Sequence, residues 1–110
     1  MKQGEIWNAN LDPIRGSEQA GFRPVVIVSG NLLNEHLQVV IVCPLTTKVK
    51  SYKGNPILTP NNINKLKLTS EILVFHIRSV SKFRLIEKIG AVSKTEIKTI
   101  QATVSDILRY

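Results

Sequence analysis

The chain has 110 residues, 43% of them hydrophobic, one cysteine and a formal net charge of +7, which fits a single domain over residues 1–110. This composition excludes a disordered chain, and a lone cysteine excludes an internal disulfide. No apolar run approaches the ~20 residues of a membrane span, and no apolar signal core is present at the N-terminus. We therefore expect a folded, cytoplasmic protein with no membrane partner.

The positive charge is unevenly distributed along the chain. Residues 1–47 carry 3 Lys or Arg and 4 Asp or Glu, a net charge of −1, whereas residues 48–110 carry 12 and 4, a net charge of +8. One interpretation is a solvated surface that keeps a small protein soluble. The other is a surface that binds a polyanion, because clustered Lys and Arg attract a phosphate backbone whatever its sequence.

The first half of the chain predicts three strands. Residues 5–11 alternate apolar and polar side chains, and the β-branched run over 24–30 reads as a buried strand. Residues 31–36 are too few for a stable helix and predict a single turn. The run over 37–45 predicts the strongest strand, with Pro44 marking its end or an edge position.

The second half predicts short strands separated by loops, followed by one helix. The expected elements are a mobile, lysine-rich loop over 46–55, a strand over 56–60, a loop over 61–70, a strand over 71–80, a turn or short helical piece over 81–85 and a strand over 86–92.

The C-terminal segment changes to the helical period. Ser93 and Glu96 form a capping box, in which each side chain accepts from the other residue's free backbone N–H. Apolar residues then follow at spacings of three and four: Ile97, Ile100, Val104, Ile107 and Leu108. Five or six short strands with one terminal helix predict a mainly β (α+β) fold, a bent sheet or partly open barrel closed on one side by the helix.

Metal and cofactor chemistry find little support in the sequence. His36, His76 and Cys43 have no paired spacing, so we expect no metal site. Cys43 lies in an apolar strand and reads as a small core residue. No glycine-rich nucleotide fingerprint is present, so we expect no cofactor.

His76 and Arg78 lie in the sequence VFHIRSV. On one strand, residues two apart project from the same face, so this pair near the basic loop would suit phosphate contact. The alternative for His76 is an ordinary sheet-surface histidine. Composition and spacing by themselves indicate a small basic β domain for which nucleic-acid binding is one interpretation, and they specify no reaction.

Three motifs carry a resemblance. The stretches DPIRGSEQAGFRPVVIVS, CPLTT and HIRSVSKFRL resemble the MazF/PemK family of toxin endoribonucleases, over nearly the whole chain from Gly4 to the C-terminal helix. The resemblance implies a small SH3-like, partly open barrel of about five to seven strands with a C-terminal helix. It also implies a homodimer that cleaves single-stranded RNA without a metal.

The resemblance also implies the site residues. The catalytic arginine falls on Arg23, in G-x-R-P, and the catalytic threonine on Thr46. The other implied residues contact RNA: Glu18, Gln19, Thr47, Lys48, Lys50, His76 and Arg78.

One departure from the family motif bears on the chemistry. This chain has His76 where relatives commonly have glutamine, and Phe75 where some have an acidic residue. An acid–base scheme that needs this carboxylate cannot operate here, so the general base is left open, with His76 as one candidate.

The implied partners are a cognate antitoxin, whose disordered tail inhibits by lying across the RNA groove, and operator DNA bound by the toxin–antitoxin complex. Two alternatives to the enzyme stay open. One is a non-catalytic toxin of the same fold that inhibits a protein target such as gyrase. The other is an RNA-binding domain without catalysis.

Overall fold

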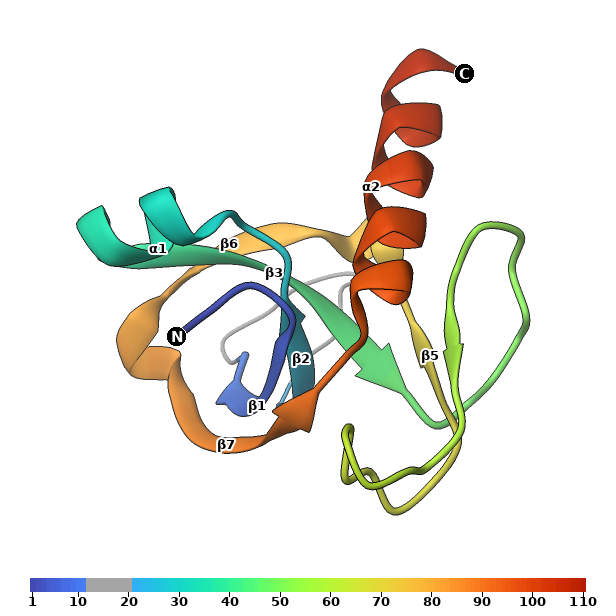
Figure 1. Ribbon diagram of the computed structural model, residues 1–110, viewed down its shortest axis with the longest axis horizontal. Coiled ribbons are helices and arrows are strands. Elements are labelled where there is room, and N and C mark those ends of the chain that lie inside the picture. The colour runs from blue at the N-terminus through green and yellow to red at the C-terminus, as the bar shows by residue number, and fades with distance from the viewer. Residues whose placement is uncertain (12–20) are drawn as a thin grey trace.

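The computed structural model describes residues 1–11 and 21–110. Seven short strands and one long C-terminal helix dominate it (Figure 1). The strands are β1 (Glu5–Asn10), β2 (Phe22–Ile27), β3 (Val39–Thr46), β4 (Ile57–Leu58), β5 (Ser70–Ile72), β6 (Arg78–Ser81) and β7 (Leu85–Ala91). The expected mainly β fold, a partly open barrel with a terminal helix, is confirmed.

The strands form one antiparallel sheet in the order β4-β5-β3-β2-β1-β7, and β6 also pairs with β3. Strand β3 organises the sheet, because one of its edges pairs with β2 while the other pairs first with β6 and then with β5. Because β6 and β5 pair with different parts of β3, the sheet curls into a half-barrel (Figure 1).

The predicted continuous strand over 71–80 is wrong, because the 3-10 turn η1 (Val74–His76) separates β5 from β6. The interruption lies beside Pro44. The Pro44 carbonyl accepts a hydrogen bond from the Leu73 N–H at 2.9 Å, but proline has no N–H to donate in return. The expectation that Pro44 ends β3 or lies at an edge is also wrong, since β3 continues to Thr46 and Pro44 itself lies between Val25 of β2 and Leu73.

The interruption changes which side chains share a face. Leu45 pairs with Ile72 and Val42 pairs with Arg78, so three steps along β3 correspond to six along the facing segment. His76 is in the extra turn and Arg78 begins the next strand. The prediction that these two residues share one strand face is therefore wrong.

In the part of the chain that the structure describes, two α-helices accompany the sheet: α1 (Asn31–His36) in place of the expected single turn, and α2 (Lys94–Arg109). The predicted capping box of α2 is confirmed. The Glu96 N–H donates to Ser93 Oγ at 3.1 Å and the Ser93 N–H donates to Glu96 Oε1 at 2.7 Å. Another 3-10 turn, η2 (Lys82–Arg84), connects β6 to β7 as the sequence predicted.

The apolar face of α2 is only partly buried. Ile97 and Ile100 pack into the core, whereas Ile107 and Leu108 in the last two turns are 45% and 80% exposed. Figure 1 shows this end of α2 extending past the sheet. Within residues 1–11 and 21–110, no helix is long and apolar enough to cross a membrane.

The sheet buries residues on both of its faces. One core cluster lies where α2 packs on the sheet, and it contains Ile6, Val26, Cys43, Leu45, Leu58, Ile72, Val74, Val92, Ile97 and Ile100. The second cluster contains Ala9, Leu11, Val25, Ile27, Val40, Val42, Val80 and Leu85. Alternation along β2 divides the two clusters, because Val26 faces the first while Val25 and Ile27 face the second.

Candidate active site

A groove with a volume of about 720 Å³ lies where β2 begins and β3 ends. The described residues that line it come from β2, from β3 and the loop after it, and from the segment around η1. They are Phe22, Arg23, Pro24, Leu45, Thr46, Thr47, Lys48, Lys50, Tyr52, Ser70, Leu73, Phe75 and His76. Three of these side chains are basic and none is acidic, so the groove attracts an anionic ligand.

Arg23 is held at the mouth of the groove by its strand. Its guanidinium donates from Nη1 to the Leu45 carbonyl at 3.4 Å, and its side chain is half-buried. Pro24 follows it directly and fixes the backbone where β2 enters the sheet. The arginine is thus anchored on a strand, where its charge keeps one direction.

Thr46 lines the groove together with this arginine and directly follows Leu45, whose carbonyl accepts from Arg23 Nη1 at 3.4 Å. The β2–β3 pairing ends at Val25 and Pro44, so Arg23 and Thr46 each lie two residues beyond it. The Thr46 hydroxyl oxygen accepts from the Lys48 N–H at 3.1 Å, which leaves its O–H proton able to be donated to a ligand.

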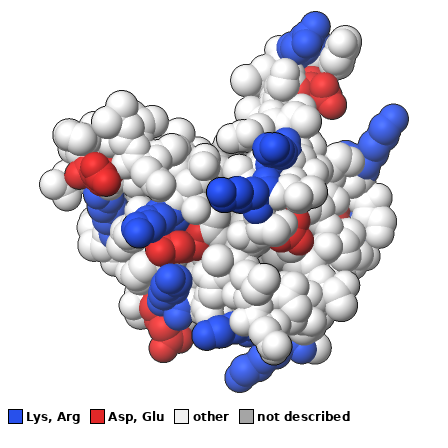
Figure 2. All heavy atoms as spheres, in the orientation of Figure 1, with Lys and Arg blue, Asp and Glu red and all other residues white. Residues whose placement is uncertain are grey.

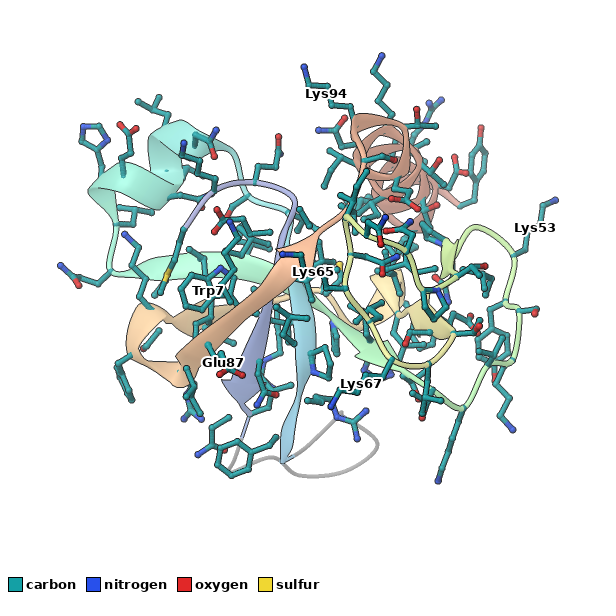
Figure 3. All side chains as sticks on the ribbon, turned by 60° about the horizontal axis from the view of Figure 1, so that its bottom comes forward. Trp7, Lys53, Lys65, Lys67, Glu87 and Lys94 are labelled. Atoms are coloured by element: carbon teal, nitrogen blue, oxygen red, sulfur yellow. The ribbon has the colours of Figure 1, made fainter. Side chains whose placement is uncertain are left out.

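The loop after β3 supplies the other cations of the groove. Thr47, Lys48 and Lys50 are exposed and line it. Lys53, near the tip of the same loop, points outward from the body (Figure 3). On the face shown in Figure 2, Lys and Arg are spread over the surface with Asp and Glu among them. The positive charge of the groove therefore comes from the few Lys and Arg residues that line it, and not from a positively charged face of the whole molecule.

Aromatic rings form one wall of the groove. The Tyr52 and Phe75 rings meet edge to face with centroids 5.8 Å apart, and the Phe75 and His76 rings are 4.6 Å apart. Phe75 is 49% exposed and Tyr52 is 52% exposed. The interruption of the β5–β6 segment creates this wall, because it carries Phe75 and His76 out of the ladder and into the groove.

Beneath the loop lies a buried carboxylate that the sequence analysis missed. Glu71 is fully buried on β5, and its oxygens accept hydrogen bonds from Asn55 Nδ2 and from three backbone N–H groups of residues 50–52. Burial raises the pKa of this carboxyl, but the hydrogen bonds from Asn55 and the backbone outweigh burial and hold the pKa below its ordinary value of 4.5. The 46–55 loop is therefore tethered at its backbone, where the sequence predicted a mobile loop.

The described residues contain no cluster of metal ligands. In residues 1–11 and 21–110, no three His, Cys, Asp or Glu side chains gather into a group that would hold a metal ion. Cys43 is fully buried between core residues, and burial raises the pKa of its thiol to about 12. The prediction that Cys43 is a core residue is confirmed.

Comparison with known proteins identifies the family. The sequence profile of the PemK-like, MazF-like toxins of type II toxin–antitoxin systems matches residues 2–108. The chain belongs to this family. The Endoribonuclease MazF of Staphylococcus saprophyticus subsp. saprophyticus is 33% identical to this toxin over 105 residues, which cover 94% of this chain and 88% of that protein.

Solved structures share the fold of this MazF-like toxin. The crystal structure of MazF (Form-I) from Deinococcus radiodurans has a TM-score of 0.86 at 23% identity, covering 100% of this chain and 97% of that one. A mycobacterial endoribonuclease in complex with its cognate antitoxin has a TM-score of 0.80 at 22% identity, covering 98% and 94%. At these identities the likeness shows the fold alone.

The structure brings most of the predicted site residues of the toxin together. The residues that line one groove are Arg23, Thr46, Thr47, Lys48, Lys50 and His76. Arg78 lies opposite Val42 on β6 and is not among the described residues that line the groove, so its contact with RNA stays a prediction. Glu18 and Gln19 lie outside the described residues.

Proposed function

We propose that this MazF-type toxin endoribonuclease cleaves single-stranded RNA, without a metal ion, by attack of the 2′-hydroxyl on its own 3′-phosphate. The products are a 2′,3′-cyclic phosphate and a free 5′-hydroxyl. The observation that carries the proposal is that Arg23 and Thr46 line one groove, whose described lining contains three Lys or Arg side chains and no acidic side chain.

The reaction makes three demands on the protein. The 2′-oxygen forms a bond to phosphorus and loses its proton, while the bond from phosphorus to the 5′-oxygen breaks and that oxygen gains a proton. Negative charge accumulates on the phosphate oxygens between these events. Stabilising that charge with fixed donors is the largest contribution that such a site makes.

We assign Arg23 to the phosphate in the transition state. A guanidinium carries a permanent charge and a planar fork of donors that matches two phosphate oxygens, and it is a poor base because it stays protonated. Thr46 donates a hydrogen bond to the same phosphate. His76, which lines the groove, is our candidate for contacting a base or moving a proton.

The remaining groove residues are assigned to RNA binding. Lys48 and Lys50 neutralise neighbouring phosphates, and Thr47 supplies a second hydroxyl. The exposed rings of Tyr52 and Phe75 offer apolar faces on which unpaired bases stack, an interaction worth about 1–3 kcal/mol per base. This arrangement favours single strands, whose bases are free to splay onto a protein surface.

The test replaces the two assigned side chains. We expect Arg23→Ala to lower cleavage of a single-stranded RNA by about 10²–10³-fold or more, because a charge-stabilising donor is lost. Thr46→Val, which keeps the side-chain shape, should cost about tenfold through one hydrogen bond. The readout is the amount of 2′,3′-cyclic phosphate ends, measured in the presence of EDTA.

The matched control for charge is Arg109→Ala. Arg109 lies at the end of α2 beside the Tyr110 ring, and its loss should leave cleavage unchanged. A substrate with 2′-deoxyribose at the cut position should be bound but not cleaved. Near-normal cleavage by Arg23→Ala would contradict the assignment of this arginine, and cutting of the deoxyribose substrate would contradict internal attack.

The partners of the toxin are proposed from its family. We propose that the toxin acts as a homodimer in the cytoplasm, and that a cognate antitoxin places a disordered tail across the groove. The antitoxin complex in turn binds operator DNA. Solved complexes of a mycobacterial endoribonuclease and of Deinococcus MazF with their antitoxins support the antitoxin part. Protection of the RNA from cleavage by an added antitoxin peptide is the measurement that checks it.

A further inference from the structure

Glu71 is a fully buried charge in a part of the fold that faces the groove. It lies on β5, where it pairs with Thr46 of β3 on one side and with Ile57 of β4 on the other. Burying a charged carboxylate is expensive unless hydrogen bonds satisfy it. The hydrogen-bond donors to this carboxylate therefore indicate its structural role.

Four donors converge on the Glu71 carboxylate. Oε1 accepts from the Lys50 N–H at 2.7 Å and from the Ser51 N–H at 2.8 Å. Oε2 accepts from the Tyr52 N–H at 3.1 Å and from Asn55 Nδ2 at 2.8 Å. Consecutive N–H groups that point to one anion form a nest, and Ser51 adopts the left-handed conformation, with φ 57°, within this one.

The nest sets the direction of the loop side chains. The backbone of Lys50 and Tyr52 is fixed by Glu71, and the side chains of both residues line the groove. Without the carboxylate, three consecutive N–H groups would turn to water, and the left-handed residue between them would lose the contact that stabilises it. The loop could then no longer present its cation and its ring in one geometry.

Asn55 extends the same network to the other wall of the groove. Its Nδ2 donates to Glu71, and its Oδ1 accepts from the Val74 N–H at 3.2 Å. Val74 begins η1, which carries Phe75 and His76 into the groove. The lysine-rich loop and the η1 turn are therefore joined through the Glu71 carboxylate and the Asn55 amide. The contact between the Tyr52 and Phe75 rings joins the same two segments a second time.

We propose that Glu71 is a positioning residue for substrate recognition, which organises the 50–55 loop and η1 into one wall that binds the RNA strand. This inference rests on the proposed function. Arg23 lies opposite Ala9 in the β1–β2 ladder, and Thr46 lies opposite Glu71 in the β3–β5 ladder, which the backbone forms and not the carboxylate. The network around Glu71 therefore controls the affinity for RNA more than the rate of the chemical step.

The test is Glu71→Gln in the full chain, with a short single-stranded RNA as substrate. Glutamine keeps the shape but turns an NH₂ toward the backbone donors. We expect KM to rise about tenfold or more while kcat stays within about threefold, and the Kd for a 2′-deoxy, uncleaved analogue should rise by the same factor. Hydrogen exchange at residues 50–52 should become faster by about tenfold or more in the free protein.

The matched control is Glu5→Gln. Glu5 is another carboxylate held by hydrogen bonds, from Trp7 Nε1 at 2.9 Å and from the Lys2 N–H at 3.1 Å, but it is absent from the described lining of the groove. Figure 3 marks Trp7, its partner. We expect the KM of this variant to match that of the unmodified protein. If the KM of Glu5→Gln rose as much as that of Glu71→Gln, the effect would be a general loss of folding, and the proposal would be overturned.

A second variant keeps the inference testable if Glu71→Gln does not fold. Asn55→Ala removes the link between loop and η1 and should raise KM in the same direction by a smaller factor. An unchanged KM in a folded Asn55→Ala or Glu71→Gln variant, or a fall in kcat alone, would overturn the inference while RNA cleavage by the unmodified protein stands. Failure of the unmodified protein to cleave RNA would instead overturn the proposed function, and this inference with it.

Discussion

At the scale of single residues, burial separates the side chains that are available for chemistry from those that are not. Cys43 has the most reactive atom type in the chain, yet it is fully buried in the first core cluster, with its thiol pKa raised to about 12. Arg23 is less reactive but half-buried at an open groove. Position in the fold, not intrinsic reactivity, makes the arginine the residue that we propose for catalysis.

The native protein should therefore resist thiol reagents. At pH 8 a thiol whose pKa is about 12 is almost entirely protonated, and the thiolate is the reactive form. We expect Cys43 to be labelled by a disulfide reagent only as the protein unfolds, with full labelling in denaturant. Rapid stoichiometric labelling of the folded protein would contradict the buried position of Cys43.

At the scale of elements, loops are held to the sheet by backbone contacts that require particular residues. The 61–69 segment docks on β7, where the Ala91 N–H donates to the Ile63 carbonyl at 3.0 Å. The neighbouring Gly90 makes this approach possible, because a Cβ at this position would lie 2.3 Å from the Asn64 carbonyl oxygen. A strand glycine here serves close packing of one backbone on another.

Gly90→Ala should destabilise the fold by about 1–3 kcal/mol, because the added methyl group forces the docked loop or β7 to move. The control is Gly30→Ala, where an added Cβ has nothing within 4 Å and the backbone is extended with φ −66°. Urea denaturation gives both free energies of unfolding. Equal values for the two variants would show that the loop does not press against β7.

At the scale of the whole molecule, stability in acid depends on carboxylates that the native state keeps ionised. Glu71 is the most deeply buried of these among the described residues. Its four donors are backbone and amide groups, which do not titrate. Because the pKa of its carboxyl is lower in the folded than in the unfolded protein, Glu71 stabilises the fold above the unfolded-state pKa.

The stability that Glu71 provides is lost as the pH falls below about 4.5 and through the lower folded-state pKa. We expect the free energy of unfolding to decline in this window, and to decline less steeply in Glu71→Gln, which has no proton to gain at this position. Thermal denaturation of both proteins between pH 7 and pH 3 measures the difference. Identical slopes would show that Glu71 is not held ionised.

Local patterns in the sequence predicted much of the fold and pointed to the two residues that we propose for catalysis. The capping box and the three-and-four spacing identified α2, since both signals are contained in one short segment. The G-x-R-P and C-P-L-T-T motifs pointed to Arg23 and Thr46, because each residue is placed by the strand that directly adjoins it. The curl of the sheet followed from the number of short strands before one helix.

Other features depended on contacts between distant segments. The break in the predicted strand over 71–80 arises from the missing N–H of Pro44, on a strand about thirty residues earlier. Glu71 resembles an ordinary strand residue until the loop twenty residues before it folds over the carboxylate. Neither feature has a signal in its own neighbourhood of the sequence.

The sequence by itself determined the family and the terminal helix, and it pointed to Arg23 and Thr46, because all of these rest on short motifs and regular spacings. Only the tertiary structure decided that His76 enters the groove while Arg78 does not, and that a buried glutamate holds the basic loop. The physical reason is that hydrogen bonds between strands and loops are satisfied across space. A residue far along the chain can therefore redirect a side chain that its own neighbours leave undetermined.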